Sequence, residues 1–409
     1  MFGFIELITL LLSLSGFGVQ PNPKAPSADV SLQYAMPDPD VVVHFDAMTV
    51  IPNNYKVLTA LPNKPEIKSS PELSQMVRQV IGQIEGARGM AKSATGIDIS
   101  TDVNDATVFF QFVPQKEPNF VATVHGKFST GVVDKIGKLT KGNVTKIGNS
   151  MMVEMGANEP ALGVTKDGVM IVGTKNLVSD RLQDTWKAPA RAPGSNLAHA
   201  ADVINAKPIY AVVVNMSPAA RKQATQSIGG KNFVTDVITR HKLITVSVFT
   251  DGIGWTWIDS TKAGLDSMEM MSQGGLELLK AAQIAPRGIA KIALAGLESY
   301  KGTNKQVDQV LSRKQDVLKL IDTYTGDGNF KQTITKDVAK LRLDVRAQGK
   351  TLSEVVSAGM LFPGVVAWLT LSRGGGMKSA TATTPAMAEE AKPVPAPPPA
   401  RKGLGGNKP

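Results

Sequence analysis

The stretch LITVSVFTDGIGWTWI, residues 243–258, decides the predicted fold. Residues 243–249 and 253–258 are rich in β-branched and aromatic side chains, which favour strands. Asp251-Gly252 lies between them and is typical of the tight turn that joins two antiparallel strands. The stretch therefore predicts a β-hairpin. Because strand side chains alternate between faces, Trp255 and Trp257 are expected on the same face.

The same order of elements is predicted in both halves of the chain. In the first half we expect strand 40–45, a helix from Ser70-Pro71 that ends at Gly86 and Gly89, strands 106–112 and 120–125, helix 130–139, strands 150–155, 161–164 and 169–173, and helix 176–182. In the second half we expect strand 209–214, a helix from Ser217-Pro218, strands 243–249 and 253–258, helices 261–282 and 303–324, and strands 330–335 and 341–347. The shared order indicates an internal duplication. Because the connections are mostly hairpins, the expected class is α+β: two duplicated modules of antiparallel sheet with helices packed on one face.

Composition shifts divide the chain into segments. The stretch KAPARAPG, residues 187–194, is the best boundary between the two modules. The expected segments are 1–19, a signal peptide or membrane anchor; 20–36, a Pro-rich spacer; 37–186, the first module; 187–196, a linker; 197–354, the second module; 355–372, an apolar segment; and 373–409, a disordered Pro/Ala-rich tail.

The two ends are more apolar than the body. Phe2–Val19 is nearly all hydrophobic and carries a single charged side chain, Glu6, which indicates either export or membrane anchoring. Val355–Ser372 is uncharged, and both a second membrane helix and a buried element of the body fit it equally well. We therefore expect the membrane as a partner, with the protein anchored in or exported to the bacterial cell envelope, periplasmic or on the outer surface.

The composition excludes several classes of chemistry. The chain has 409 residues, a net charge of +10, four His and no Cys, so disulfides and thiolate chemistry are excluded. Lys and Arg are dispersed and are not interleaved with aromatic residues, which argues against a nucleic-acid surface. The absence of Cys fits an oxidising compartment.

No catalytic motif is present in the sequence. Gly229-Gly230-Lys231 lacks the upstream Gly of a phosphate-binding loop, and no zinc-binding His pair or nucleophile elbow occurs. His44 and His125 are expected to be strand side chains, and His199 lies in an Ala-rich helix. His241 lies between two cationic residues and is expected at the surface. We predict no catalytic residue, no cofactor and no metal.

One surface remains a candidate for binding. Trp255 and Trp257, together with Met268 and Met271 of the following helix, could form a ligand or partner surface. The alternative is that these side chains pack in the core between hairpin and helix. The partner, if one binds there, is expected to be a protein or a lipid-like molecule.

Two segments carry a family resemblance. Residues 121–128, VATVHGKF, and residues 161–173, ALGVTKDGVMIVG, resemble uncharacterised bacterial envelope proteins built from tandem α+β modules behind an N-terminal anchor. This resemblance implies a location and a fold and no activity. Gly3-Phe4 and Glu6 also resemble the start of a type IV pilin, although that family has its Glu two residues later and a basic leader before the Gly.

Three hypotheses for function follow. The first is a non-catalytic, membrane-tethered envelope protein with a binding or scaffolding role. The second is a hydrolase or transferase whose site is assembled from distant positions, which predicts a pocket that gathers ionisable side chains. The third is a subunit of a pilus-like or secretion assembly.

Overall fold

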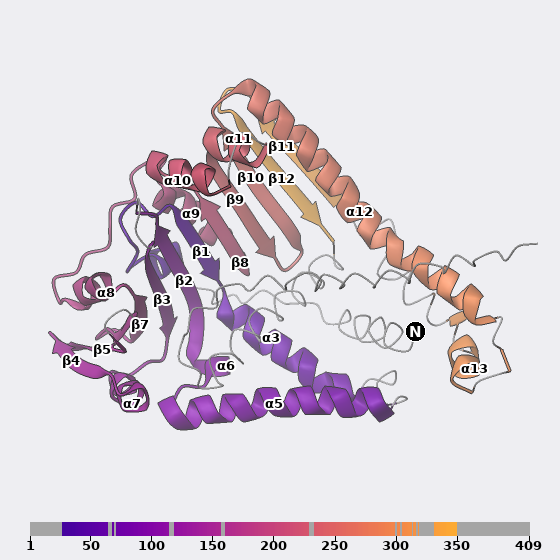
Figure 1. Ribbon diagram of the computed structural model, residues 1–409, viewed down its shortest axis with the longest axis horizontal. Helices are drawn as coiled ribbons and strands as arrows, with labels where there is room; N and C mark the ends of the chain where they lie inside the picture. The colour runs from indigo at the N-terminus through magenta and orange to yellow at the C-terminus, as the bar shows by residue number, and fades with distance from the viewer. Residues whose placement is uncertain are drawn as a thin grey trace, which may run out of the picture.

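The residues that the structure describes are organised by an antiparallel sheet of twelve strands (Figure 1). The computed structural model describes residues 27–63, 68, 71–113, 118–156, 160–228, 233–298, 301–302, 305–312, 314–315, 318 and 331–349. The two terminal apolar segments, the tail and half of the helix expected at 303–324 lie outside the described residues.

The strands are β1 (Val41–Phe45), β2 (Val103–Gln111), β3 (Asn119–Gly126), β4 (Asn143–Ile147), β5 (Ser150–Glu154), β6 (Ala161–Val164), β7 (Val169–Gly173), β8 (Tyr210–Val214), β9 (His241–Phe249), β10 (Gly252–Asp259), β11 (Lys331–Asp337) and β12 (Arg342–Gln348). The helices of the described residues are α2 (Ala28–Ser31), α3 (Ala47–Ala60), α5 (Pro71–Thr95), α6 (Ile99–Asp102), α7 (Gly131–Thr140), α8 (Lys175–Leu182), α9 (Asn196–Asn205), α10 (Pro218–Ile228), α11 (Phe233–Arg240), α12 (Lys262–Glu298) and α13 (Lys305–Ser312).

The strand order joins the two halves of the chain at the centre of the sheet. It runs β11-β12-β10-β9-β8-β1-β2-β3-β7-β6-β5-β4. β1 pairs antiparallel with β8, with Val43 opposite Val212 at the middle of both strands. From this pair outward, β1-β2-β3-β7-β6 and β8-β9-β10-β12-β11 follow the same plan. The α+β class with antiparallel pairing is confirmed, and the duplication stays a prediction.

Helices cover both faces of the sheet, so the prediction of helices on one face is wrong. On one face, α2, α8 and α9 pack over a core that includes Phe109, Val121 and Val213. On the other face, α7 packs over β4, β5 and β6, and α12 packs over β10 and β12. The physical reason is that both sets of alternating side chains on these strands contain apolar residues, so each face has a surface to bury.

Two predicted boundaries differ from the structure. Helix α5 begins at Pro71 as predicted but continues past Gly86 and Gly89 to Thr95. A glycine inside a helix costs only about 1 kcal/mol, and the Arg88 guanidinium in this stretch binds Asp98, which ties the extra turns to the body. The spacer expected over 20–36 also extends too far. Within its described part, Leu32 and Met36 are 1% exposed because they pack in the core.

Candidate functional site

The four side chains predicted as a binding surface lie between β10 and α12. Trp257 is 4% exposed, and its Nε1 donates a hydrogen bond to Asp259 Oδ2 at 2.9 Å. Trp255 and Met268 are partly buried in the same core beneath α12, while Met271 is 45% exposed. The structure therefore gathers Trp255, Trp257 and Met268 into core packing and leaves Met271 on the outside. A ligand role for these residues stays a prediction.

His241 is buried, so its predicted surface position is wrong. Its ring is 1% exposed and lies 5.8 Å from the Trp257 ring, measured between centroids. His241 is the first residue of β9, whose alternation turns His241 inward and Lys242 outward. The direction of the strand side chains, rather than the charge of the neighbouring residues, decides where this imidazole lies.

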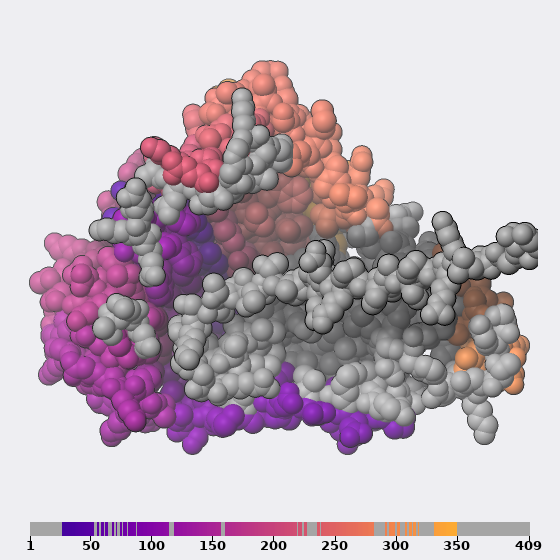
Figure 2. Space-filling model, in the orientation of Figure 1, coloured from indigo at the N-terminus to yellow at the C-terminus, as the bar shows by residue number. Residues whose placement is uncertain are grey.

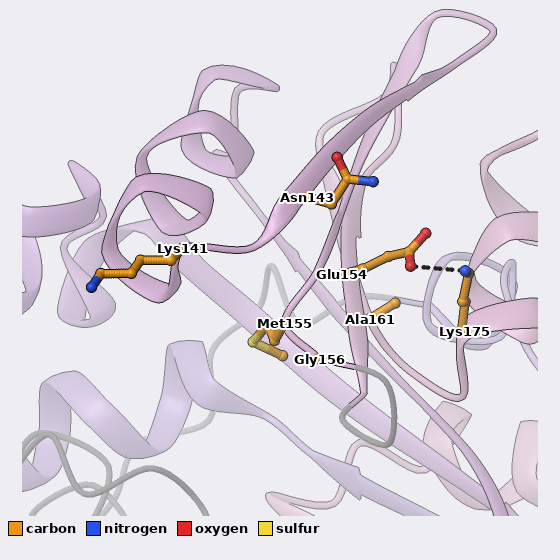
Figure 3. Close-up of a pocket in the computed structure, with 7 residues that line it drawn as sticks. All are labelled: Lys141, Asn143, Glu154, Met155, Gly156, Ala161 and Lys175. Atoms are coloured by element: carbon orange, nitrogen blue, oxygen red, sulfur yellow. Dashed lines mark ion pairs between the residues drawn. The ribbon is translucent and has the colours of Figure 1, made fainter.

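A surface pocket of about 350 Å³ lies beside β4, β5 and β6 (Figure 3). Glu154 and Lys175 point toward one another across it, and Glu154 Oε2 lies 2.8 Å from Lys175 Nζ. This ion pair largely cancels the charge that either group could offer a ligand. The lining residues are Lys141, Asn143, Glu154, Met155, Gly156, Ala161 and Lys175.

A second pocket, of about 320 Å³, lies between the residues that precede β1, the start of α9 and the start of α10. Of its two carboxylates, Asp38 and Asp40, Asp40 accepts hydrogen bonds from the backbone N–H of Phe112 at 2.8 Å and of Ser217 at 2.5 Å. Both oxygens of Asp40 are therefore engaged in holding the start of α10 against the sheet.

The ionisable side chains that come closest to a catalytic arrangement lie in the interior, under α2. This buried polar cluster consists of Ser31, His44, Asp105, Thr107 and His125, each at most 4% exposed. The Asp105 carboxylate is its centre. Oδ2 of Asp105 accepts a hydrogen bond from Ser31 Oγ at 2.5 Å, and Oδ1 lies 3.0 Å from His125 Nδ1. His44 Nδ1 lies 3.0 Å from Thr107 Oγ1.

The arrangement of the buried polar cluster differs from that of a serine hydrolase. A serine nucleophile needs a base, usually a histidine, within hydrogen-bonding distance of its hydroxyl. Here the Ser31 hydroxyl donates to the carboxylate, and the histidines contact other atoms. Because the cluster is also sealed from solvent, its geometry supports structural pairing of buried polar groups rather than catalysis.

Burial shifts the pKa of His44 in this cluster and of Asp46 close to it. Desolvation lowers the pKa of His44 to about 4, although the nearby Asp105 carboxylate acts in the opposite direction. Desolvation also raises the pKa of Asp46, which follows β1 and hydrogen-bonds Thr49. His44 is therefore neutral at physiological pH.

The opposite face of β1 and β2, continued by β8 and β9, carries apolar side chains and one phenol hydroxyl, that of Tyr210. We call it the central apolar face. The registers of β2, β1, β8 and β9 place three rows of four side chains on it. The middle row consists entirely of valines. The rows are Phe110, Val41, Val214 and Ile244; Val108, Val43, Val212 and Val246; and Ala106, Phe45, Tyr210 and Val248.

Helices frame the central apolar face at its margins. Val50 of α3 packs against the row that contains Phe45 and Tyr210. On one side α12 packs over β10 and β12, and on the other side α7 packs over β4–β6. Figure 1 shows α3 continuing from the end of β1 and α12 beside β11 and β12, and Figure 2 shows α5 and α12 along two separate edges of the molecule. Every side chain of the middle row is half-buried rather than sealed.

Two runs of valine in the sequence are a signal for the central apolar face. Val41–Val43 and Val212–Val214 are runs of three valines. Such runs are typical of strands with apolar side chains on both faces. The sequence could not show that the two runs pair with one another, because their partners are distant in the chain.

Among the residues that the structure describes, no helix combines the length and apolar character needed to cross a bilayer.

Comparison with known proteins gives distant structural neighbours only. No family model matches the chain, and no curated protein matches it. A crystal structure of TP0453 (form I) is similar with a TM-score of 0.33 and 9% identity, covering 80% of this chain and 96% of that one. A second crystal form of TP0453 (form IV) gives a TM-score of 0.30 and 9% identity, over 59% and 82% of the two chains.

Proposed function

We propose that this chain is a non-catalytic binding protein of the bacterial cell envelope that takes up a lipid-like ligand on the central apolar face. The observation that carries the proposal is the middle row, Val108, Val43, Val212 and Val246, with apolar rows on both sides of it. Four adjacent strands span about 14 Å, and three alternate side chains along each strand span a similar distance. A surface of this size and chemistry suits an acyl chain, which offers dispersion contacts and no hydrogen bonds.

The direction of the polar groups supports the same proposal. Recognition by hydrogen bonds would need donors and acceptors that face the ligand, and the polar side chains next to the middle row, His44, Thr107, Thr245 and Ser247, are buried on the opposite face. Thr107 and Thr123 are fully buried there, and His44 lies beside them. The central apolar face can therefore bury the apolar part of a ligand, but it has few hydrogen-bonding groups that would select one ligand over another. This favours binding of a class of similar ligands rather than of a single compound.

Binding of oleate, measured by displacement of a fluorescent fatty acid, tests this proposal. We expect Val43→Asp to weaken oleate binding at least tenfold, because an ionised carboxylate in the middle row opposes burial of an acyl chain. The matched control is Val338→Asp, the same change at a valine that is 48% exposed in the turn between β11 and β12. Equal affinity of both variants and the unchanged chain would contradict the proposal.

A membrane tether through Phe2–Val19 is the second part of the proposal. Its support is the composition of that segment, which carries one charged side chain. Fractionation of cells that express the untagged full chain tests the tether. We expect recovery with membranes, or processing after the segment. Intact chain found wholly in the soluble cytosol would rule it out.

A further inference from the structure

Helix α12 carries apolar side chains on two opposite faces. Leu276 is fully buried against the sheet, whereas Leu278, two residues later and therefore about 200° round the helix, is 72% exposed. Met270 and Ile292 are 73% and 75% exposed. Figure 1 shows α12 along an outer edge of the molecule, where it continues beyond the sheet. Packing among the described residues therefore does not account for the outer face of this helix.

The outer face of α12 follows a heptad repeat. Met271, Leu278 and Ile292 are separated by seven and fourteen residues, so in a coiled coil they occupy the same heptad position. A small residue follows each of them after three positions. We call this set the outer seam; it consists of Met271, Gly274, Leu278, Ala281, Ile292 and Ala295. Every member is exposed except Gly274, which is half-buried.

A second copy of α12 fits the outer seam in antiparallel orientation, because large residues then meet small ones. With Ile292 opposite Gly274 of the second copy, Met271 lies opposite Ala295, and a two-fold axis repeats both contacts. A parallel orientation would instead place Gly274 opposite Gly274, which leaves a gap between the helices. The order of large and small residues therefore favours the antiparallel pair.

The middle of α12 fits the same register. Leu278 falls opposite Gly288 of the second copy, which again pairs a large residue with a small one. Pro286 lies outside the heptad positions of the outer seam, and α12 continues through it as one helix. The paired region then runs from Met271 to Ala295, about 36 Å along the helix.

The charged residues beside the outer seam specify the same orientation. Glu277 and Lys291, both exposed, lie immediately before Leu278 and Ile292, at the position where coiled coils form ion pairs between helices. In the antiparallel register Glu277 faces Lys291 of the second copy, and the two-fold axis produces this pair twice. No ion pair between described residues includes either side chain. The outer seam is therefore complementary to itself in charge as well as in size.

A lipid surface suits the outer seam less well. Helices that lie on membranes are typically rich in Lys and Arg on their polar side. The charged residues of α12 are balanced, four basic and four acidic: Lys262, Lys280, Arg287, Lys291, Asp266, Glu269, Glu277 and Glu298. Anionic headgroups would also repel Glu277, which lies directly beside the seam.

We propose that the protein forms a two-fold dimer in which the outer seams of two α12 helices pack against one another in antiparallel orientation. The dimer assigns Met271 to contact with a second copy of the chain. It does not depend on the proposed ligand, because no residue of the outer seam belongs to the central apolar face.

Charge reversal, followed by sedimentation equilibrium of the full chain, tests the dimer and its register. Glu277→Lys places like charges opposite one another at two points and should weaken dimerisation about tenfold. Adding Lys291→Glu to that variant restores opposite charges and should return the affinity to that of the unchanged chain. The matched control is Asp134→Lys, which reverses an exposed charge on α7 and should leave dimerisation unchanged.

Two results would overturn the proposal. One is an unchanged chain that stays monomeric at every concentration. The other is a dimer that Glu277→Lys does not weaken or that the second charge reversal does not restore. Retained cooperative unfolding of each variant verifies that it is folded.

Disulfide formation tests the antiparallel orientation, since the protein has no native Cys. Chains with Met271→Cys and chains with Ala295→Cys, which carry tags of different size, should crosslink to one another after mixing and mild oxidation. The matched control replaces Met271→Cys with Gln273→Cys, which is exposed but outside the seam, and should crosslink severalfold less. Efficient crosslinking of Met271→Cys chains with each other would contradict the antiparallel register.

Flotation with vesicles of phosphatidylethanolamine and phosphatidylglycerol distinguishes a second copy from a membrane. We expect Leu278→Asp to abolish the dimer and to leave flotation unchanged. A monomeric chain whose flotation is reduced by Leu278→Asp and increased by Glu277→Lys would assign the outer seam to a lipid surface and would overturn the dimer.

Discussion

The two faces of the four central strands differ in a way that hydrophobicity alone does not explain. The face under α2 and α9 contains polar groups, among them His44 and Thr107, and yet it is sealed from solvent. The central apolar face has no comparable polar side chains, and yet its middle row is only half-buried. Buried polar groups tolerate this environment when they contact one another, as Asp105 and Ser31 do. The sealed face therefore stabilises the fold, whereas a binding role for the apolar face is the proposal to be tested.

The largest expected effect comes from two adjacent phenylalanines that point to opposite faces. Phe109 is fully buried on the sealed face, and Phe110 is half-buried on the other. We expect Phe109→Ala to lower the free energy of unfolding by about 3–5 kcal/mol, because it leaves a cavity in a packed core. Phe110→Ala should cost less than half of that and should weaken oleate binding. Urea unfolding measures both, and equal losses would remove the distinction between the faces.

The pH dependence of stability provides the next test. In the folded protein the pKa of His44 is about 4, below the usual 6.5. Between these values the unfolded chain binds a proton that the folded chain does not. Stability should therefore fall as the pH is lowered from 6.5 to 4, by about 3 kcal/mol in total, and should lose no more from this group below pH 4.

His44→Asn is the control for that pH dependence. Asp46 acts with the opposite sign, because its raised pKa gives stability that is lost as the pH rises through that value. The difference in the free energy of unfolding between the unchanged chain and His44→Asn, measured at each pH, gives the contribution of the histidine alone. Identical pH profiles for the two proteins would show that this imidazole is not responsible.

Asp105, the centre of the buried polar cluster, should contribute to the free energy of unfolding about as much as a hydrogen bond to a charged group does. We expect Asp105→Asn to lower the free energy of unfolding by about 2 kcal/mol, since it removes the carboxylate that accepts from Ser31. The control is Asp29→Asn, which breaks an ion pair with Arg191. The side chain of Asp29 is 86% exposed. That pair should contribute less than about 0.5 kcal/mol. Similar effects at both positions would contradict a special role for the sealed cluster.

The smallest expected effect concerns α12, where the same contrast recurs between neighbouring methionines. Met268 packs into the core under α12, whereas Met271 is 45% exposed. Met268→Ser should lower the free energy of unfolding by about 1–2 kcal/mol, and Met271→Ser should change it by less than about 0.5 kcal/mol. Thermal unfolding followed by circular dichroism distinguishes them. A larger loss at Met271 would indicate a contact that is absent from the described residues.

Local sequence patterns predicted most of the described strands. They failed where the position or burial of a residue depends on residues far away in the chain. The hairpin at 243–258 and the turn at Asp251-Gly252 were found because alternation and turn chemistry are local properties. Strand β4 (Asn143–Ile147) was missed, since this edge strand has mixed polarity and a largely exposed pattern. The charged neighbours of His241 favour a surface position, but the direction of its side chain at the start of β9 places it inside.

The candidate site was predicted only in part. Trp255, Trp257 and Met268 were correctly expected to lie near one another, and the structure covers them with α12. The buried polar cluster was not predicted, because Ser31, His44, Asp105 and His125 come from four separate segments. His44 and His125 were correctly interpreted as strand residues without any sign that Asp105 lies between their strands.

The sequence by itself determined where most of the described strands form and that neighbouring strands pair as antiparallel hairpins. These properties depend on residues a few positions apart, so they can be recognised in one dimension. Only the tertiary structure decided that both modules share one sheet through Val43 and Val212, and which face of that sheet is sealed. Such strand pairings depend on the apolar area that segments far apart in the chain bury together. No short stretch of sequence contains all of these segments.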